Sequence, residues 1–227
     1  MKVFIGVGHG GADPGAVSGG VHEADINLTM ALAMRDYLTM YGVDVGISRV
    51  TDENDPLDEE IAEANAFSPD LAVEIHNNAG GGDGWECYRQ TNTYSNQSLR
   101  ASGKIEARVK EIGQNSRGIK TKFLPNGKDW FGWCRLVDAP AVLCEGFFID
   151  NPTDAKDFRS VEQQEAMGVA YAKGVLDYFG IKLNPDTGVG KVYRVQTGYF
   201  TTKSNAEGQA AALKEAGFPV IIKEEEI

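Results

Sequence analysis

Four residues with side chains suited to metal binding or proton transfer follow apolar segments of this sequence. His9, His76 and Glu145 come at or just after short apolar runs, and Glu23 closes the glycine-rich loop that leaves the first run. Two imidazoles and a carboxylate are the usual protein ligands of a catalytic zinc, and a further carboxylate can take and return protons. The four residues together indicate a metal-dependent hydrolytic site.

Structural roles for the same residues have to be weighed against this interpretation. A single histidine at the end of a strand is more often a hydrogen-bonded structural residue than a ligand, and Glu145 alone could cap a helix. His22 stands beside Glu23, but neighbours on a loop rarely both reach one metal. We therefore expect His22 to support the site from outside or to face solvent.

The elements that must position these side chains alternate between strand and helix patterns. Strands are predicted over 2–7, 43–48, 71–76, 85–89, 135–137 and 141–145, and helices over 26–41, 58–67, 95–114 and 160–179. Asp25 is the predicted cap of the first helix, and Ser160 with Gln163 forms a capping box for the last. This alternation predicts an α/β fold with a mostly parallel, twisted sheet and helices on both faces. Ligand-binding loops converge at the carboxyl ends of such strands.

The remaining segments define the domain organisation. Residues 77–84 and 117–133 are predicted loops, and the glycine- and proline-containing stretch 184–190 is a predicted linker. Residues 191–227 have the pattern of a small βαβ unit, with strands over 192–197 and 219–223 and a helix opened by Ser204. We therefore predict a catalytic domain over 1–183, followed by the linker and the small unit.

Composition excludes several classes of partner. The chain has 227 residues and a formal net charge of −11, which argues against nucleic acid because phosphate binding needs clustered Lys and Arg. No apolar run is long enough to cross a membrane, and we expect synthesis in the cytoplasm without a signal peptide. The cysteines Cys87, Cys134 and Cys144 form no C-x-x-C pair and are predicted to be reduced core residues.

A nucleotide site is the sharpest rival for the first loop. Gly6-x-Gly8-x-x-Gly11 matches the dinucleotide-binding fingerprint and follows a predicted strand. That fingerprint requires a helix to begin at once, so that its N-terminus faces the pyrophosphate. Here further glycines and Pro14 intervene before the predicted helix, which disfavours nucleotide binding.

Several motifs in order along residues 2 to about 180 closely resemble the amidase-3 family, the zinc-dependent N-acetylmuramoyl-L-alanine amidases. They are GHGGADPGA over 8–16, Glu23, Asn27-Leu28, Ser48-Arg49-x-x-Asp52, Ala64-Asn65, Asp70-Leu71, IHNNA over 75–79 and PAVLCEGFFIDN over 140–151. The resemblance implies zinc ligands at His9, Glu23 and His76 and a catalytic Glu145. It also implies a substrate, the amide joining N-acetylmuramic acid to L-alanine of the peptidoglycan stem peptide.

The sequence departs from the family pattern in two places. Glu74 stands two residues before His76, where the family usually has a small hydroxyl residue, and Gly146-Phe147 follow the last acid. Because strand side chains alternate, Glu74 and His76 point to the same side. Glu74 is therefore predicted to accept the second N–H of the His76 imidazole, with a solvated or salt-bridged acid as the alternative.

The segment after Lys191 resembles half of a SPOR domain, a peptidoglycan-binding module, through Tyr193, Val195, Gly198-x-Phe200 and an alanine-rich helix. We expect peptidoglycan as the partner and a homodimer joined through 191–227. The alternatives are docking of the unit on the catalytic domain or ordering on glycan. The missing signal fits a phage or prophage endolysin better than a cytoplasmic recycling enzyme. A non-catalytic wall-binding protein and a zinc peptidase that cuts within the stem peptide remain rival functions.

Overall fold

The computed structural model describes residues 1–154, 160–183, 200, 202–215, 220 and 222. The chain divides into two compact units, Met1–Lys182 and Leu183–Ile227. In the second unit the described element is helix α7, Lys203–Glu215, which begins one residue before the predicted Ser204 cap. The strand expected over 192–197 lies outside the described residues, as does most of the strand expected over 219–223.

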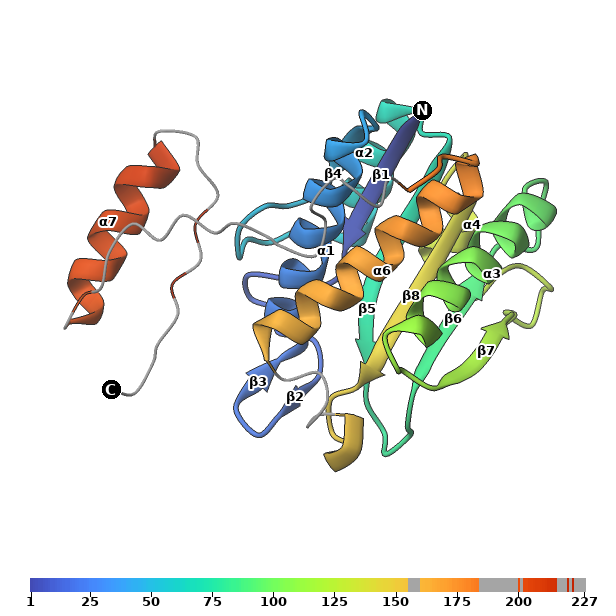
Figure 1. The fold of residues 1–227 in the computed structure, drawn as a ribbon. Helices are drawn as coiled ribbons and strands as arrows, with labels where there is room; N and C mark the ends of the chain where they lie inside the picture. The colour runs from blue at the N-terminus through green and yellow to red at the C-terminus, as the bar shows by residue number, and fades with distance from the viewer. Residues whose placement is uncertain (155–159, 184–199, 201, 216–219, 221, 223–227) are drawn as a thin grey trace. The chain divides into compact units, whose positions relative to one another are not determined.

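A six-stranded sheet forms the centre of the first unit, in the order β4-β1-β5-β8-β6-β7 (Figure 1). All neighbours pair in parallel except β6 and β8, which are antiparallel. The strands are β1 Lys2–Val7, β4 Asp44–Ile47, β5 Leu71–Asn78, β6 Trp85–Arg89, β7 Ser116–Lys120 and β8 Ala141–Phe148. This confirms the predicted α/β class and the mostly parallel sheet.

Helices cover both faces of this sheet (Figure 1). The helices are α1 Glu23–Met40, α2 Leu57–Phe67, α3 Ser95–Glu111, α4 Gly132–Leu136 and α6 Val161–Phe179. On one face α6 packs between α1 and α3, and α2 and α4 lie on the other. The predicted capping box opens α6, where Ser160 accepts from the Gln163 amide. No helix among the described residues is long and apolar enough to cross a membrane.

The predicted strand over 135–137 is wrong. Residues 132–136 form the short helix α4, because a helical turn directs Trp133, Cys134 and Val137 into one apolar cluster with Phe4 of β1. A strand would have turned alternate side chains of this segment away from that cluster. The segment 117–133, predicted to be irregular, begins instead as the edge strand β7.

The first helix begins earlier than predicted, and this changes the position of one site residue. Helix α1 starts at Glu23 rather than after Asp25, and His22 stands at its N-cap position. The loop before it contains a short hairpin, β2 Val17–Ser18 paired with β3 Val21–His22, which the sequence pattern did not reveal. Glu23 is therefore held at a helix terminus and not on a free loop.

The buried guanidinium of Arg49 fixes the glycine-rich loop to the sheet and to α1. Its Nε donates to the carbonyl oxygen of Val7 (3.1 Å), and its Nη2 donates to those of Gly8 (3.3 Å) and Ala24 (2.8 Å). Arginine suits this position because its planar fork presents several donors in fixed directions. The side chain thereby connects the end of β1 to the start of α1, the two points from which His9 and Glu23 extend.

We predict that Arg49→Met lowers the free energy of unfolding by about 2–4 kcal/mol, because several buried carbonyl groups lose their donors at once. Urea denaturation of the full chain measures this change. Arg35→Met is the matched control, since Arg35 pairs with its exposed neighbour Asp36 on α1 and should contribute less than about 1 kcal/mol. Equal effects of the two variants would contradict the role given to Arg49.

Candidate metal centre and active site

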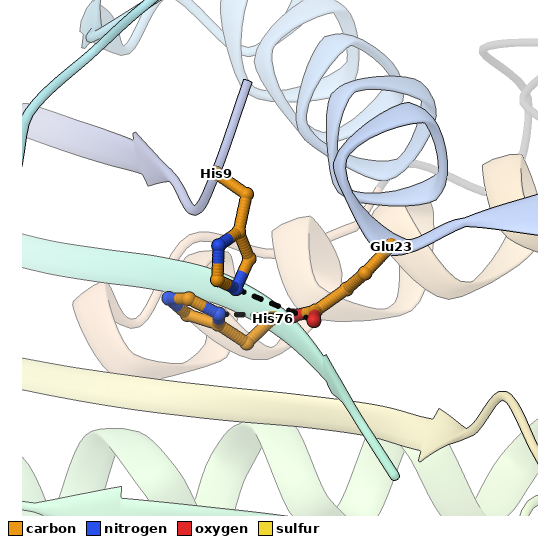
Figure 2. Close-up of side chains that lie close together, drawn as sticks. All are labelled: His9, Glu23 and His76. Atoms are coloured by element: carbon orange, nitrogen blue, oxygen red, sulfur yellow. Dashed lines mark hydrogen bonds and ion pairs between the residues drawn. The ribbon is translucent and has the colours of Figure 1, made fainter. Parts of the chain in front are cut away.

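Three residues far apart in the sequence meet at the carboxyl end of the sheet (Figure 2). Nε2 of His9 lies 3.3 Å from Oε2 of Glu23, and Nδ1 of His76 lies 3.0 Å from Oε1 of the same carboxylate. The two imidazole rings stand nearly perpendicular, with centroids 5.0 Å apart. One ligand atom from each residue lies within 4.8 Å of the others, which is a geometry that could hold a metal ion. Two nitrogens and one carboxylate oxygen are a donor set that suits zinc.

In each imidazole, the ring nitrogen that does not face Glu23 contacts a second carboxylate. Nδ1 of His9 lies 2.8 Å from Oδ2 of Asp13, and Nε2 of His76 lies 3.1 Å from Oε1 of Glu74. The contact predicted between Glu74 and His76 is therefore present. Such partners fix the tautomer and ring orientation of metal-binding histidines. They leave Nε2 of His9 and Nδ1 of His76 to face Glu23.

Glu23 is the most enclosed member of the group, with an exposed fraction of 4%. Its Oε1 also accepts from the Asn77 amide (3.0 Å), and its Oε2 accepts from the Ala16 amide (3.0 Å). Burial alone would raise the pKa of Glu23, but the hydrogen bonds from His76 and His9 outweigh burial and hold that pKa well below its usual range. Glu23 is thus a buried, charged oxygen donor with a fixed orientation.

Both histidines are basic in this arrangement. The hydrogen bond to Glu23 raises the pKa of His9 although burial opposes it. Burial acts to lower the pKa of His76, but the charge of Glu74 and the contact with Glu23 raise it well above its usual value. A metal ion that binds here must therefore replace protons on the imidazoles.

Two glycines leave room for the cluster. A Cβ on Gly8 would overlap the ring of His76, and one on Gly15 would meet both the His9 ring and the Glu23 carboxylate. Gly15 also has φ of +64°, a conformation that side chains rarely adopt. Gly8 of the fingerprint-like motif therefore makes space for an imidazole and not for a pyrophosphate. Since α1 begins only at Glu23, no helix starts directly after the glycine motif, as a dinucleotide site would need.

Glu145 lies beside His76 on the neighbouring strand. The two residues are register partners between β5 and β8, and Glu86 of β6 is the partner of Glu145 on its other side. Burial raises the pKa of Glu145 to about 7, and His76 opposes this change. Glu86 is itself neutralised by Arg117 (2.7 Å) and by Lys120. Glu145 is therefore a carboxyl group able to hold or release a proton near neutral pH.

A pocket of about 570 Å³ lies beside the two histidines and Glu145. His9, His76 and Glu145 line it, as do Asp13 and Glu74, and its apolar wall includes Leu57, Phe131, Trp133 and Leu143. A pocket of this volume suits a small molecule or a short stretch of a polymer.

The structure brings His9, Glu23 and His76 together and places Glu145 beside them, as the sequence led us to expect. His22 is exposed and lies outside this group, with its Nδ1 3.7 Å from Oδ2 of Asp25. Sequence reasoning did not assign the role of Asp13, because a contact between residues 9 and 13 depends on the positive φ of His9 (64°). It also missed Asp55 and Glu60, which line the pocket from segments without a recognisable motif.

Residues 3–177 match the amidase-3 family, which is described as N-acetylmuramoyl-L-alanine amidase. The chain belongs to this family. It is accordingly an N-acetylmuramoyl-L-alanine amidase, an enzyme that hydrolyses peptidoglycan.

Known relatives extend this similarity. The chain is 34% identical to the sporulation-specific N-acetylmuramoyl-L-alanine amidase of Bacillus subtilis, over 98% of this chain and 84% of that protein. It is 33% identical to the endolysin of Bacillus phage SPP1, over 79% of this chain and 66% of that protein. Among solved structures, an N-acetylmuramoyl-L-alanine amidase from Clostridium difficile 630 superposes with a TM-score of 0.70 and 26% identity, covering 78% of this chain and 96% of that one.

We predict that Glu74→Gln and Asp13→Asn each weaken zinc affinity by about 10–100-fold, because each removes the carboxylate that orients an imidazole. Competition titration with a zinc chelator measures the change. His22→Ala is the control, since the His22 imidazole is exposed and lies outside the group. The zinc affinity of this variant should equal that of the unsubstituted chain. Unchanged affinity in both carboxylate variants would show that these contacts do not support metal binding.

Proposed function

We propose that the predicted catalytic domain, residues 1–183, is a zinc-dependent amidase with ligands His9, Glu23 and His76 and with Glu145 as the proton shuttle. The bond cleaved is the amide between the lactyl group of N-acetylmuramic acid and L-alanine of the stem peptide. The observation that carries this proposal is the convergence of the three ligand atoms within 4.8 Å, beside a carboxyl group that lines the same pocket. Family membership supplies the substrate class.

The residues of the chain divide the work. His9, Glu23 and His76 would hold zinc, and Asp13 and Glu74 would keep the two imidazoles oriented. The chemistry that zinc supplies when bound is the activation of water and the polarisation of the scissile carbonyl. Glu145 accepts a proton from the attacking water and returns it to the leaving amine, a role typically worth ~10²–10⁴ in rate. Its pKa near 7 suits both steps.

Two rival functions keep the same fold. A non-catalytic wall-binding protein would not need a complete set of metal-binding donors with both imidazoles oriented by carboxylates. This chain has such a set. A zinc peptidase that cuts within the stem peptide would use similar residues, and only the identity of the new terminus separates it from an amidase.

Purified peptidoglycan tests the proposal directly. We expect the zinc-loaded full chain to release fragments whose new N-terminus is alanine, with no new terminus inside the stem peptide. Release of another residue would identify a peptidase, and zinc binding without any release would indicate a wall-binding protein.

The variant Glu145→Gln separates metal binding from proton transfer in the same assay. We expect it to retain stoichiometric zinc and to lose most of the hydrolysis, whereas His9→Ala and His76→Ala should lose both. Metal analysis by mass spectrometry provides the zinc content. Loss of zinc from Glu145→Gln but not from His76→Ala would reverse the roles assigned here.

For the second part of the chain we propose a linker over 184–190 and a SPOR-like, wall-binding unit over 191–227. The amidase-3 match ends at residue 177, but the similarity to the Bacillus subtilis enzyme extends over 98% of the chain. The C-terminal segment is thus shared with at least one amidase. We also propose an endolysin role, in which the protein made in the cytoplasm acts on the wall after release, and the similarity to the phage SPP1 endolysin supports it.

We predict that the full chain is a homodimer joined through residues 191–227, because a unit of fewer than about 40 residues seldom folds without a partner, and two-fold pairing is the commonest assembly. Light scattering of the full chain and of residues 1–183 tests this prediction, with the mass of a dimer expected only for the full chain. A monomeric full chain at roughly tens of micromolar would contradict it. A dimer that survives truncation would move the interface to the first unit.

A further inference from the structure

One end of the pocket is acidic, and the mechanism above gives no role to Asp55 and Glu60 there. Asp55, Glu60 and Glu74 line it together with His76, and no Lys or Arg is among the described residues that line the pocket. Oε1 of Glu60 accepts from the Val7 amide (2.8 Å) and from the Ser48 hydroxyl (3.1 Å), so this carboxyl group is fixed in place. The pocket therefore places three carboxyl groups beside the metal centre, and the nearby cation that acts on Asp55 and Glu60, the buried Arg49, does not line the pocket.

Two carboxylate oxygens at this end lack donors. Oε2 of Glu74 and Oδ2 of Asp55 are buried and accept no hydrogen bond from any described residue. Glu74 has an exposed fraction of 3%, and its other oxygen is used by His76. A buried oxygen without a donor carries a desolvation cost that a bound donor removes. Two such oxygens on one pocket point to a ligand group that donates hydrogen bonds and carries positive charge.

A third buried group on the same pocket wall is also without a partner. Nε1 of Trp133 donates to no described residue, although the side chain is completely buried and lines the pocket. An indole N–H is a donor only, so it requires an acceptor such as a carbonyl or carboxylate oxygen. The unmet groups are thus two acceptors and one donor.

Burial, together with repulsion among these acids, raises the pKa values of Glu60 and Asp55. Burial raises the pKa of Glu60 well above its usual range, and the charges of Glu74 and Asp55 raise it further. Burial likewise raises the pKa of Asp55, against the opposing effects of Ser48 and Arg49 and with smaller contributions from Glu53 and Glu74. A cation placed among them would relieve this repulsion.

We propose that Glu74 and Asp55 form a subsite for a primary ammonium group of the stem peptide, with Trp133 Nε1 donating to a neighbouring carbonyl or carboxylate oxygen. This inference rests on the proposed function, because it assigns the peptide side of the same substrate to the acidic end of the pocket. An ammonium group has three donors and no acceptor, which matches the two free carboxylate oxygens. The subsite would favour stem peptides whose third residue is a diamino acid with a free side-chain amine. A cross-link that acylates this amine removes its charge.

A second metal ion fits this end of the pocket less well. Among the described residues, His9, Glu23 and His76 form a group whose ligand atoms approach within 4.8 Å, and Asp55, Glu60 and Glu74 form no such group. A metal needs several converging ligands at fixed short distances, whereas an ammonium group needs as few as two carboxylate oxygens within hydrogen-bond reach of its nitrogen.

The test compares two soluble substrates with the zinc-loaded full chain. One is N-acetylmuramoyl-L-alanyl-D-isoglutaminyl-L-lysine, and the other is the same molecule with its lysine Nε acetylated. We expect kcat/KM to be at least about tenfold higher for the free amine, which corresponds to a charge-assisted hydrogen bond in a pocket. Equal kcat/KM for the two substrates would overturn the proposal.

Variants assign the preference to the pocket. Asp55→Asn removes one charge from the subsite and should reduce the preference for the free amine by about fivefold or more. Asp58→Asn is the matched control, because Asp58 is an exposed acid at the start of α2 that does not line the pocket. An Asp58→Asn variant that loses as much preference as Asp55→Asn would overturn the assignment. The substrate comparison needs no variant, so a failure of Asp55→Asn to fold leaves the test intact.

Binding separates this inference from the proposed function. Calorimetry measures the affinity of the full chain for the peptide L-Ala-D-isoGln-L-Lys and for its Nε-acetyl form. Tighter binding of the free amine without hydrolysis of either muramoyl substrate would support the subsite and refute the amidase mechanism. Hydrolysis with no preference in rate or binding would support the mechanism and overturn the subsite.

Discussion

The arrangement of the site depends on one buried carboxylate, that of Glu23. A charge with 4% exposure is costly unless each oxygen is paired, and here both oxygens accept from backbone amides and face an imidazole. The position of Glu23 at the first residue of α1 adds a favourable interaction with the helix dipole. The loop after β1, the start of α1 and the end of β5 are thereby held to a common point.

Strand register then determines which chemistry surrounds that point. Glu74 and His76 are two residues apart on β5, so their side chains lie on the same side of the strand. The register partner of His76 on β8 is Glu145. The carboxylate that orients His76 and the carboxyl group that can transfer a proton therefore come from different strands and different environments. Glu74 is committed to an imidazole through one oxygen, whereas burial keeps the pKa of Glu145 near 7. A slip of one residue between β5 and β8 would remove Glu145 from this side of the sheet.

The sequence predicted much of this arrangement because its strongest signals are local. Apolar runs that end in His76 and Glu145 identify β5 and β8, and the capping box at Ser160 identifies α6. The failures have non-local causes. Segment 132–136 is helical because Trp133 and Cys134 must both enter the cluster below α2, and α1 begins at Glu23 because its carboxylate is fixed by distant amides. The free oxygens of Glu74 and Asp55 follow from what surrounds them in space, which no spacing along the chain reveals.

The edge strand β7 bears on whether two copies of the molecule can pair through their sheets. β7 is an edge strand of five residues that carries Arg117 and Lys120, and Gly118 within it has φ of +91°. Its pairing with β6 also contains a register shift. Short length, positive charge and an irregular backbone make such an edge a poor template for another strand. The same two cations neutralise Glu86, which lies beside Glu145 of β8. One pair of side chains therefore balances the charge of a buried acid and also disfavours aggregation through the β7 edge of the sheet.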